Sequence, residues 1–170
     1  MARAPVSPHA GSMRIGIVSD THDRVLAALH AALSGVDEIL HAGDIASREA
    51  LAEIETIAPV IAVAGNMDDP ALAHRLPAET ILERDGVRIA LLHGHRAGRA
   101  SVDDLEDRYG DRGVDLVVWG HIHEPVSEER AGVRYFNPGT AGGIGAAATC
   151  GILTTDKGWF TVEHRTLDAE

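Results

Sequence analysis

Apolar and polar residues alternate along the first half of the chain in a way that predicts strands separated by helices. Short apolar runs typical of buried strands occur at Arg14–Ser19, Glu38–His41 and Val60–Ala64. Between them, Val25–Leu33 and Arg48–Ile57 carry apolar residues at helical spacing, and Ser47 is placed to cap the second helix. This order of strands and helices predicts a parallel sheet with right-handed crossovers.

The second half of the chain is mostly strand-like. Asp85-Gly86, a dipeptide typical of hairpin turns, lies between the apolar runs Thr80–Glu83 and Val87–Leu92. One helix is predicted to begin at Ser101, with Asp104 three residues on as in a capping box. Further strands are predicted at Asp115–Trp119, Val133–Phe136, Gly151–Thr155 and Phe160–Arg165. We therefore expect an α/β fold with two sheets packed together and helices outside.

The chain is organised as one domain after a short leader. Residues 1–12 contain two prolines and no hydrophobic period, which predicts a disordered leader or a remnant of cloning. Residues 13–168 contain no repeat and no linker, and 170 residues match one ordinary domain, so we expect a single domain there. The glycine- and alanine-rich stretch Gly139–Thr149 is expected to be a mobile loop.

Composition and charge exclude several classes of function. Fifteen Lys and Arg against 26 Asp and Glu give a formal charge of −11, so the chain should repel long nucleic acids. The single Cys150 excludes a disulfide framework and a cysteine-based zinc site. No apolar run approaches the ~20 residues that cross a bilayer, and no signal sequence is evident, so a cytoplasmic protein is expected.

Polar residues follow five predicted strands, and this is where the candidate chemistry lies. The segments are Ser19-Asp20-Thr21-His22, Gly43-Asp44, Gly65-Asn66-Met67-Asp68, His93-Gly94-His95 and Gly120-His121-Ile122-His123. The carboxyl ends of strands line the ligand crevice in α/β folds. Two Asp, four His and one Asn suit borderline divalent metals such as Mn, Fe, Co, Ni or Zn. Seven such groups are too many for one ion and fit two.

These five segments, in this order, resemble the motifs of the calcineurin-like metallophosphoesterases, in the small single-domain phosphodiesterase branch. The resemblance runs from about Met13 to Thr166 and implies a four-layer α/β/β/α sandwich of two mixed sheets flanked by helices. It implies that the first metal binds Asp20, His22, Asp44 and His123. The second would bind Asp44, Asn66, His93 and His121, with Asp44 as the bridge. Asn137-Pro138-Gly139-Thr140 also resembles a stretch of this branch.

The resemblance implies hydrolysis of small phosphodiesters by attack of a metal-bridging hydroxide, with Mn²⁺ as the expected ion. Many members of the wider family have a proton-donating His after the metal-binding Asn, but this chain has Met67, which has no proton to give. We therefore interpret His95 as the catalytic proton donor. Arg24 and Arg96 are weaker candidates for a phosphate clamp, and His41 is expected either to have a structural role or to orient Asp44.

Alternative functions stay open at this stage. A phosphomonoesterase would use the same metals and nucleophile, so the residues do not separate it from a phosphodiesterase. The resembled family also includes a non-catalytic binding module, the small retromer subunit, but all seven ligand-type residues are present here. The expected partner is a small phosphate ester, without long nucleic acid or membrane. A homodimer is possible, because resembling proteins are often dimers.

Overall fold

The computed structural model describes residues 12–98 and 100–168, whose strands form two five-stranded sheets. The first sheet has the order β10-β9-β1-β2-β3, with bounds Trp159–Thr166, Thr149–Asp156, Met13–Val18, Glu38–His41 and Val60–Ala62. The second has the order β4-β5-β6-β8-β7, with bounds Glu79–Arg84, Val87–Leu92, Leu116–Val118, Val133–Pro138 and Pro125–Arg130. The predicted leader, residues 1–12, lies outside the described residues except for Ser12.

Both sheets are mixed. In the first sheet β1, β2 and β3 are parallel, and α1 (Ala27–Ala32) and α2 (Arg48–Glu55) connect them. In the second sheet β5, β6 and β8 are parallel, and α4 (Val102–Tyr109) connects β5 to β6. The remaining strands pair in antiparallel fashion along the sides of these parallel cores. The two mixed sheets confirm the predicted architecture.

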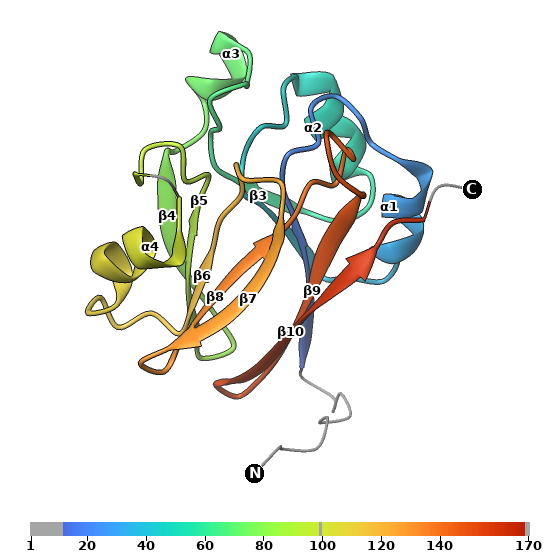
Figure 1. Ribbon diagram of the computed structural model, residues 1–170. Helices are drawn as coiled ribbons and strands as arrows, with labels where there is room; N and C mark the ends of the chain where they lie inside the picture. The colour runs from blue at the N-terminus through green and yellow to red at the C-terminus, as the bar shows by residue number, and fades with distance from the viewer. Residues whose placement is uncertain (1–11, 99, 169–170) are drawn as a thin grey trace.

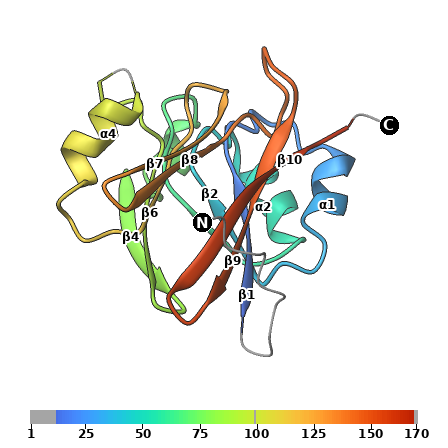
Figure 2. The same ribbon diagram turned by 60° about the horizontal axis from the view of Figure 1, so that its bottom comes forward.

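Three buried clusters show how the four layers pack. Between the sheets, Ile17 and Leu153 of the first sheet belong to the same apolar cluster as Leu91 and Phe136 of the second. A second cluster lies under α4, and a third lies under α1 and α2. Figures 1 and 2 show α4 on one side of the molecule and α1 and α2 on the other. Each sheet therefore has one face against the other sheet and one face covered by helix.

Capping signals in the sequence predict the starts of two helices, α2 and α4. Ser47 accepts a hydrogen bond from Ala50 N and caps α2. Ser101 and Asp104 form the predicted capping box of α4. Helix α3 (Pro70–Ala73) and strand β7 were not predicted from the sequence. The first is a single turn capped by Asp69, and the second is an exposed edge strand without an apolar run.

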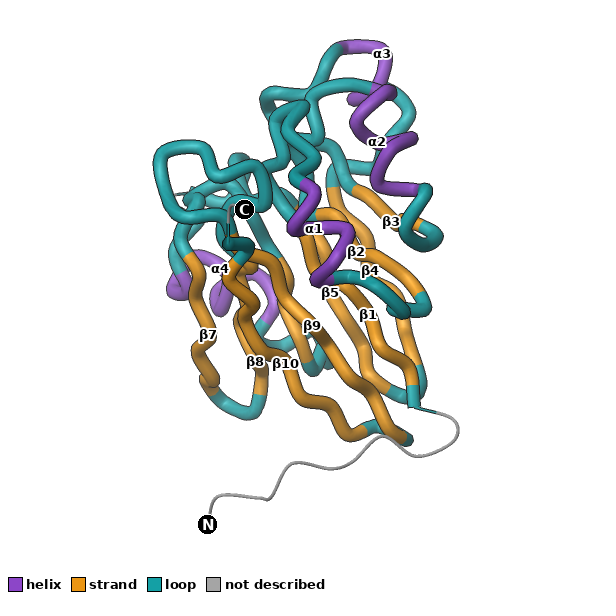
Figure 3. Tube along the Cα trace, turned by 90° about the vertical axis from the view of Figure 1, so that its right-hand side faces the viewer, coloured by secondary structure: helices purple, strands orange, loops and turns teal. Residues whose placement is uncertain are grey.

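The stretch 139–149, expected to be a mobile loop, is tied to the segment that follows β1. Ala141 N donates to Ser19 O at 2.9 Å, and Thr140 Oγ1 donates to Asp20 O at 2.8 Å. Gly142 approaches this segment so closely that a Cβ there would lie 2.2 Å from Thr21 O. The loop is therefore an anchored part of the strand-end surface. Figure 3 shows loops gathered at one end of the sheets.

Candidate metal centre

The ends of five strands bring the predicted ligands together. Asp20, Asp44 and Asn66 follow β1, β2 and β3 of the first sheet, and His93 and His121 follow β5 and β6 of the second. Two hydrogen bonds join the sheets here: His121 N donates to Asp20 Oδ2 at 3.0 Å, and His93 Nδ1 lies 2.8 Å from Ala42 O. Residues from both sheets therefore converge on one place.

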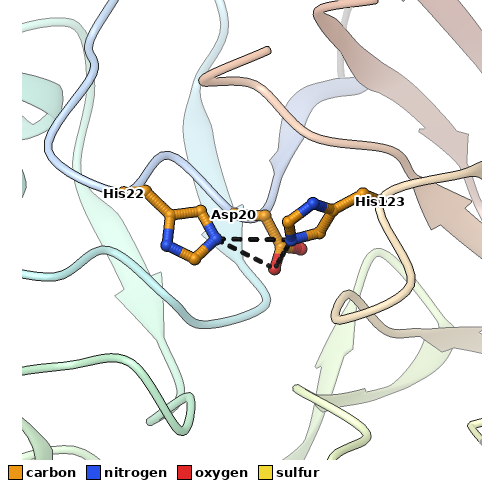
Figure 4. Close-up of side chains that lie close together, drawn as sticks. All are labelled: Asp20, His22 and His123. Atoms are coloured by element: carbon orange, nitrogen blue, oxygen red, sulfur yellow. Dashed lines mark hydrogen bonds and ion pairs between the residues drawn. The ribbon is translucent and has the colours of Figure 1, made fainter. Parts of the chain in front are cut away.

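The carboxylate of Asp20 is fully buried and only half satisfied. Its Oδ2 accepts hydrogen bonds from Ser19 Oγ at 2.5 Å and from His121 N. Its Oδ1 is buried without a hydrogen-bond partner and lies 3.1 Å from His123 Nε2 and 3.7 Å from His22 Nε2 (Figure 4). A buried acceptor without a donor costs roughly 1–3 kcal/mol. A cation between this oxygen and the two imidazoles would remove that cost.

The hydrogen bonds of two histidines fix which ring nitrogen faces these oxygens. His123 Nδ1 lies 2.9 Å from Ile144 O, and His93 Nδ1 lies 2.8 Å from Ala42 O. Carbonyl oxygens only accept, so both rings carry a proton on Nδ1 and, when neutral, present a lone pair at Nε2. His93 Nε2 is 3.3 Å from Asp44 Oδ2. Lone pairs facing carboxylate oxygens repel unless a proton or a metal ion lies between them.

Asp44 lies between the two groups of imidazoles. Its Oδ1 accepts from Met67 N at 2.7 Å, and its Oδ2 is 3.3 Å from His93 Nε2 and 3.7 Å from His22 Nε2. Burial opposes ionisation, but the hydrogen bond and charge of His93 outweigh it and lower the pKa of Asp44. For His93, burial favours the neutral ring, but Asp44 and Asp20 outweigh it and raise the pKa. In the absence of a metal, both shifts therefore favour a proton on His93 beside an ionised Asp44.

The donor atoms form two compact groups, which differ in part from the predicted sets. One group is Asp20, His22 and His123, and the other is Asp20, Asp44 and His93. Asn66 Oδ1 lies 3.1 Å from His93 Nε2 beside the second group. The ring of His121 contacts His93 edge-on at 5.1 Å between centroids, without joining either group. All seven predicted residues therefore lie in one connected cluster, and their metal ligation stays a prediction.

Most of these residues have an unusual backbone conformation. The φ angles of Asp20, His22, Asp44, His121 and His123 lie between 47° and 71°. This left-handed region is uncommon for residues other than glycine, although Asp and His adopt it more often than most. Such strain persists where the surroundings enforce it, and it clusters at functional sites.

Two glycines without positive φ allow the close approach of these segments. A Cβ on Gly65 would lie 2.1 Å from Asp44 Oδ1, and a Cβ on Gly120 would lie 1.9 Å from Ser19 Oγ. Both distances are too short for any side chain. The glycines in these motifs are therefore needed for space beside the carboxylates.

His95, the predicted proton donor, lies at the border of the cluster. Its ring centroid is 5.3 Å from that of His93 and 6.4 Å from that of His121. Arg96 Nε donates to His95 Nε2 at 3.3 Å, so the neutral ring carries its proton on Nδ1. Burial, followed by the charge of His93, lowers the pKa of His95. Its Nδ1 has no hydrogen-bond partner among the described residues.

Two further residues, Asn137 and His164, support the cluster from outside. Asn137 is buried, and its side-chain amide donates to Gly120 O at 2.9 Å. His164 stacks on Phe136 and lies 2.7 Å from Asn137 O through Nε2. The resemblance of Asn137-Pro138-Gly139-Thr140 to a family stretch was a signal for this region, but no pattern indicated His164.

Of the two roles expected for His41, its hydrogen bonds among the described residues agree with the structural one and do not include Asp44. Its Nδ1 accepts from Gly43 N at 3.2 Å, so its Nε2 carries the proton and donates to Thr21 Oγ1 at 3.1 Å. Complete burial, followed by the charge of His93, lowers the pKa of His41 to about 3. His41 therefore holds the backbone around two motif segments as a neutral ring. Asp68 supports the same region, since it accepts from Ala46 N and Gly65 N.

Comparison with known proteins decides the family. The model of the calcineurin-like phosphoesterase superfamily domain matches residues 13–158. The chain belongs to this superfamily. A probable metallophosphoesterase of Methanothermobacter thermautotrophicus is 37% identical over 133 residues, covering 75% of this chain and 77% of the relative. A phosphodiesterase of Methanocaldococcus jannaschii is 33% identical over 163 residues, covering 85% of this chain and 95% of the relative.

Solved structures of other proteins have the same fold. A structure described as a novel archaeal phosphodiesterase matches with a TM-score of 0.73 and 30% identity, covering 90% of this chain and 100% of that one. A mutant of Vps29 from Entamoeba histolytica matches with a TM-score of 0.77 at 19% identity, covering 92% and 100%. The second likeness concerns the fold alone. Together they confirm the predicted sandwich, and the family match confirms the resemblance.

Proposed function

We propose that this metallophosphoesterase is a phosphodiesterase that uses two divalent metal ions to hydrolyse small phosphodiesters. The observation that carries the proposal is the unpartnered Oδ1 of the buried Asp20, which faces imidazole nitrogens of His22 and His123. The phosphodiesterases among the relatives support the same substrate class. Mixed oxygen and imidazole donors suit Mn²⁺, with Fe, Co, Ni or Zn as alternatives.

The proposed ligands divide as the family motifs imply. Asp20, His22, Asp44 and His123 would hold the first ion, and Asp44, Asn66, His93 and His121 would hold the second. The position of Asp44 Oδ2, near both His22 and His93, supports its proposed role as the shared ligand. Two such ions, when bound, supply Lewis acidity for the phosphate oxygens and activate a water as the nucleophile.

The protein's own residues would orient these ligands and handle the leaving group. Ala42 O and Ile144 O hold the proton-bearing nitrogens of His93 and His123, which keeps each Nε2 directed at the site. We assign proton donation to His95, because Met67, the residue that follows Asn66, has no proton to give. Since the pKa of His95 is lowered, its contribution should decrease as the pH rises.

The proton-donor assignment is tested with two leaving groups. A poor alkoxide leaving group depends on protonation far more than an activated aryl oxide does. We expect His95→Ala to reduce kcat for an alkyl phosphodiester about 100-fold and for bis-p-nitrophenyl phosphate by less than about fivefold. Equal losses on the two esters would show that His95 is not the acid.

The metal requirement is tested by stripping the purified protein and titrating Mn²⁺ while following cleavage of bis-p-nitrophenyl phosphate. We expect turnover to depend on Mn²⁺ and to be lost in Asp44→Asn and in His121→Ala. Calorimetry should give two ions per chain for the wild type. Tight binding of two ions without turnover on any ester would instead favour a non-catalytic binding module.

The substrate class is tested against its main alternative, a phosphomonoesterase on the same site. We expect a higher kcat/KM for bis-p-nitrophenyl phosphate than for p-nitrophenyl phosphate, and the reverse order would make the protein a phosphomonoesterase.

No helix of the described residues is long and apolar enough to cross a membrane. A cytoplasmic location and a homodimer are further parts of the proposal, tested by cell fractionation and by light scattering.

A further inference from the structure

A small pocket opens beside His95 on the outer side of the second sheet. Its volume is about 190 Å³, and its walls come from the start of β4, the end of β5 and helix α4. Pockets that enclose a whole small ligand usually have about 300–1,000 Å³. This pocket therefore has room for one arm of a ligand rather than for a complete one.

The pocket shares a wall with the candidate metal centre. His95 lines it, and the ring of His95 lies 5.3 Å from the ring of His93 between centroids. An ester whose phosphate lies among the metal ligands can therefore extend one arm past His95 into the pocket. If His95 protonates the leaving oxygen, that arm is the leaving arm.

The charges around the pocket leave one arginine uncompensated. Arg108 Nη2 pairs with Glu79 Oε2 at 2.5 Å, and Tyr109 Oη donates to the same oxygen at 2.7 Å. The negative charge of Glu79 is thus engaged within the protein. Among residues 12–98 and 100–168, no carboxylate pairs with Arg96, whose hydrogen bond from Nε goes to His95. Arg96 is exposed and lines the pocket, so its guanidinium is available to an anion there.

The rest of the pocket wall consists of small or apolar residues. Leu92 and Ala97 are buried, and Gly94 and Ala78 complete the lining beneath the charged side chains. A short organic arm fits against such a wall, with a charged end beside the arginine. One uncompensated positive charge matches one negative charge, and the planar guanidinium matches the two oxygens of a carboxylate.

We propose that this pocket binds a carboxylate on the leaving arm of the substrate, with Arg96 as its partner. The substrate class would then be small phosphodiesters whose leaving alcohol or phenol carries a carboxylate. This assignment rests on the proposed phosphodiesterase activity and on the position of His95 at the leaving oxygen.

A pair of nearly isosteric esters tests the proposal with the Mn²⁺-loaded enzyme. Methyl 4-carboxyphenyl phosphate and methyl 4-carbamoylphenyl phosphate have the same shape, and the carbamoyl group withdraws electrons more strongly, so chemistry alone favours the amide. We expect the wild type to prefer the carboxylate about tenfold in kcat/KM. Arg96→Gln should reduce the ratio to about one or below, even if it lowers both rates by disturbing His95.

Arg165→Gln is the matched control, because it removes the same charge from an exposed side chain on β10 of the other sheet. It should keep the wild-type ratio. A wild-type ratio of one or less, a ratio unchanged in Arg96→Gln, or an equal loss in Arg165→Gln would overturn the proposal.

A binding experiment separates failure of the pocket from failure of the proposed activity. The metal-free protein is titrated with 4-hydroxybenzoate while the amide resonances of Gly94 and Ala97 are followed by NMR. We expect both to shift, with binding at least fivefold weaker in Arg96→Gln and weaker for 4-hydroxybenzamide. If this pattern holds while neither ester is cleaved, the activity is wrong and the pocket stands. Shifts elsewhere, or shifts independent of Arg96, would overturn the pocket.

Discussion

Single residues at the strand ends combine features that are each unfavourable for the stability of the free protein, and these features are explained only when they are considered together. Asp20 is buried with one oxygen unpaired, and its backbone is left-handed, as is that of His123 nearby. Each feature alone is unfavourable to the free protein, by roughly 1–3 kcal/mol. A bound cation would offset the electrostatic part, since it gives the unpaired oxygen and the facing imidazole nitrogens a common partner.

Gly120 provides the sharpest test of this packing. A methyl group there would overlap Ser19 Oγ and approach Asp20 Oδ2 to 2.6 Å, so Gly120→Ala must displace the buried carboxylate. We expect Mn²⁺ affinity to decrease 10- to 100-fold, the usual effect of disturbing groups that orient metal ligands, as measured by calorimetry. Gly132→Ala is the control, because nothing lies within 4 Å of a Cβ there. It should lower stability by about 1 kcal/mol through its positive φ and leave Mn²⁺ affinity unchanged.

The buried, neutral ring of His41 should make the stability of the metal-free protein depend on pH. Its pKa is about 3 in the folded chain and about 6.5 when unfolded. Between these values only the unfolded chain takes up this proton, so the contribution of His41 to the free energy of unfolding should decrease by about 1.4 kcal/mol for each pH unit below 6.5.

Chemical denaturation at pH 6, 5 and 4 measures this dependence. His41→Gln should show a slope smaller than that of the wild type by about this amount, because it lacks the group. His74→Gln, which removes an exposed histidine, should follow the wild type. Equal slopes for His41→Gln and the wild type would contradict the assignment of a neutral, buried ring.

At the scale of elements, the sequence predicts those helices and strands whose signal lies in the local spacing of apolar and capping residues. The runs that become β1 and β5 are mostly apolar, and the capping residues of α2 and α4 stand directly before those helices. The seven candidate ligands were found because polar residues follow such runs. Strand β7 could not be found in this way, because its side chains alternate between exposed and half-buried and include three charges.

Contacts distant in sequence lie beyond such reasoning. Thr140 is 120 residues from Asp20, yet its hydroxyl donates to the Asp20 carbonyl. Nothing local to the stretch 139–149 predicts this bond, and its glycines indicate flexibility instead. The left-handed backbone of His121 and His123 is equally invisible in the sequence, because it follows from the close packing of the two sheets' ends.

Thr140 tests whether this loop supports the metal centre. Its Oγ1 also accepts from Ile144 N at 3.2 Å, and Ile144 O holds His123. Thr140→Val keeps the shape but removes the acceptor of the Ile144 amide, and it leaves the Asp20 carbonyl with Gly142 N as its remaining donor among the described residues. We expect a loss of about 1–3 kcal/mol in the free energy of unfolding and weaker Mn²⁺ binding. Thr140→Ser keeps the hydroxyl and should retain the Mn²⁺ affinity, and an equal loss of affinity in both variants would contradict the role of the hydroxyl.

At the scale of the whole molecule, overall and local charge act in opposite directions. The chain has a formal charge of −11, whereas the proposed metal ions and Arg96 make the strand-end surface locally positive. A field of this kind repels an extended polyanion along its length but admits a small ester, whose charge lies close to the centre. Selectivity for small substrates is therefore expected from charge alone, without a separate gate.

Salt dependence tests this expectation, with an oligothymidylate of twelve nucleotides and bis-p-nitrophenyl phosphate as substrates. The distance over which charges act decreases from about 10 Å at 0.1 M salt to about 3 Å at 1 M. Screening should therefore relieve the repulsion of the oligonucleotide and raise its kcat/KM with increasing NaCl, while the value for the small ester stays nearly constant. A nuclease that binds its substrate through basic side chains should show a kcat/KM that decreases with salt, because salt weakens those contacts. A rate on the oligonucleotide that decreases with salt would thus contradict the exclusion of long nucleic acids.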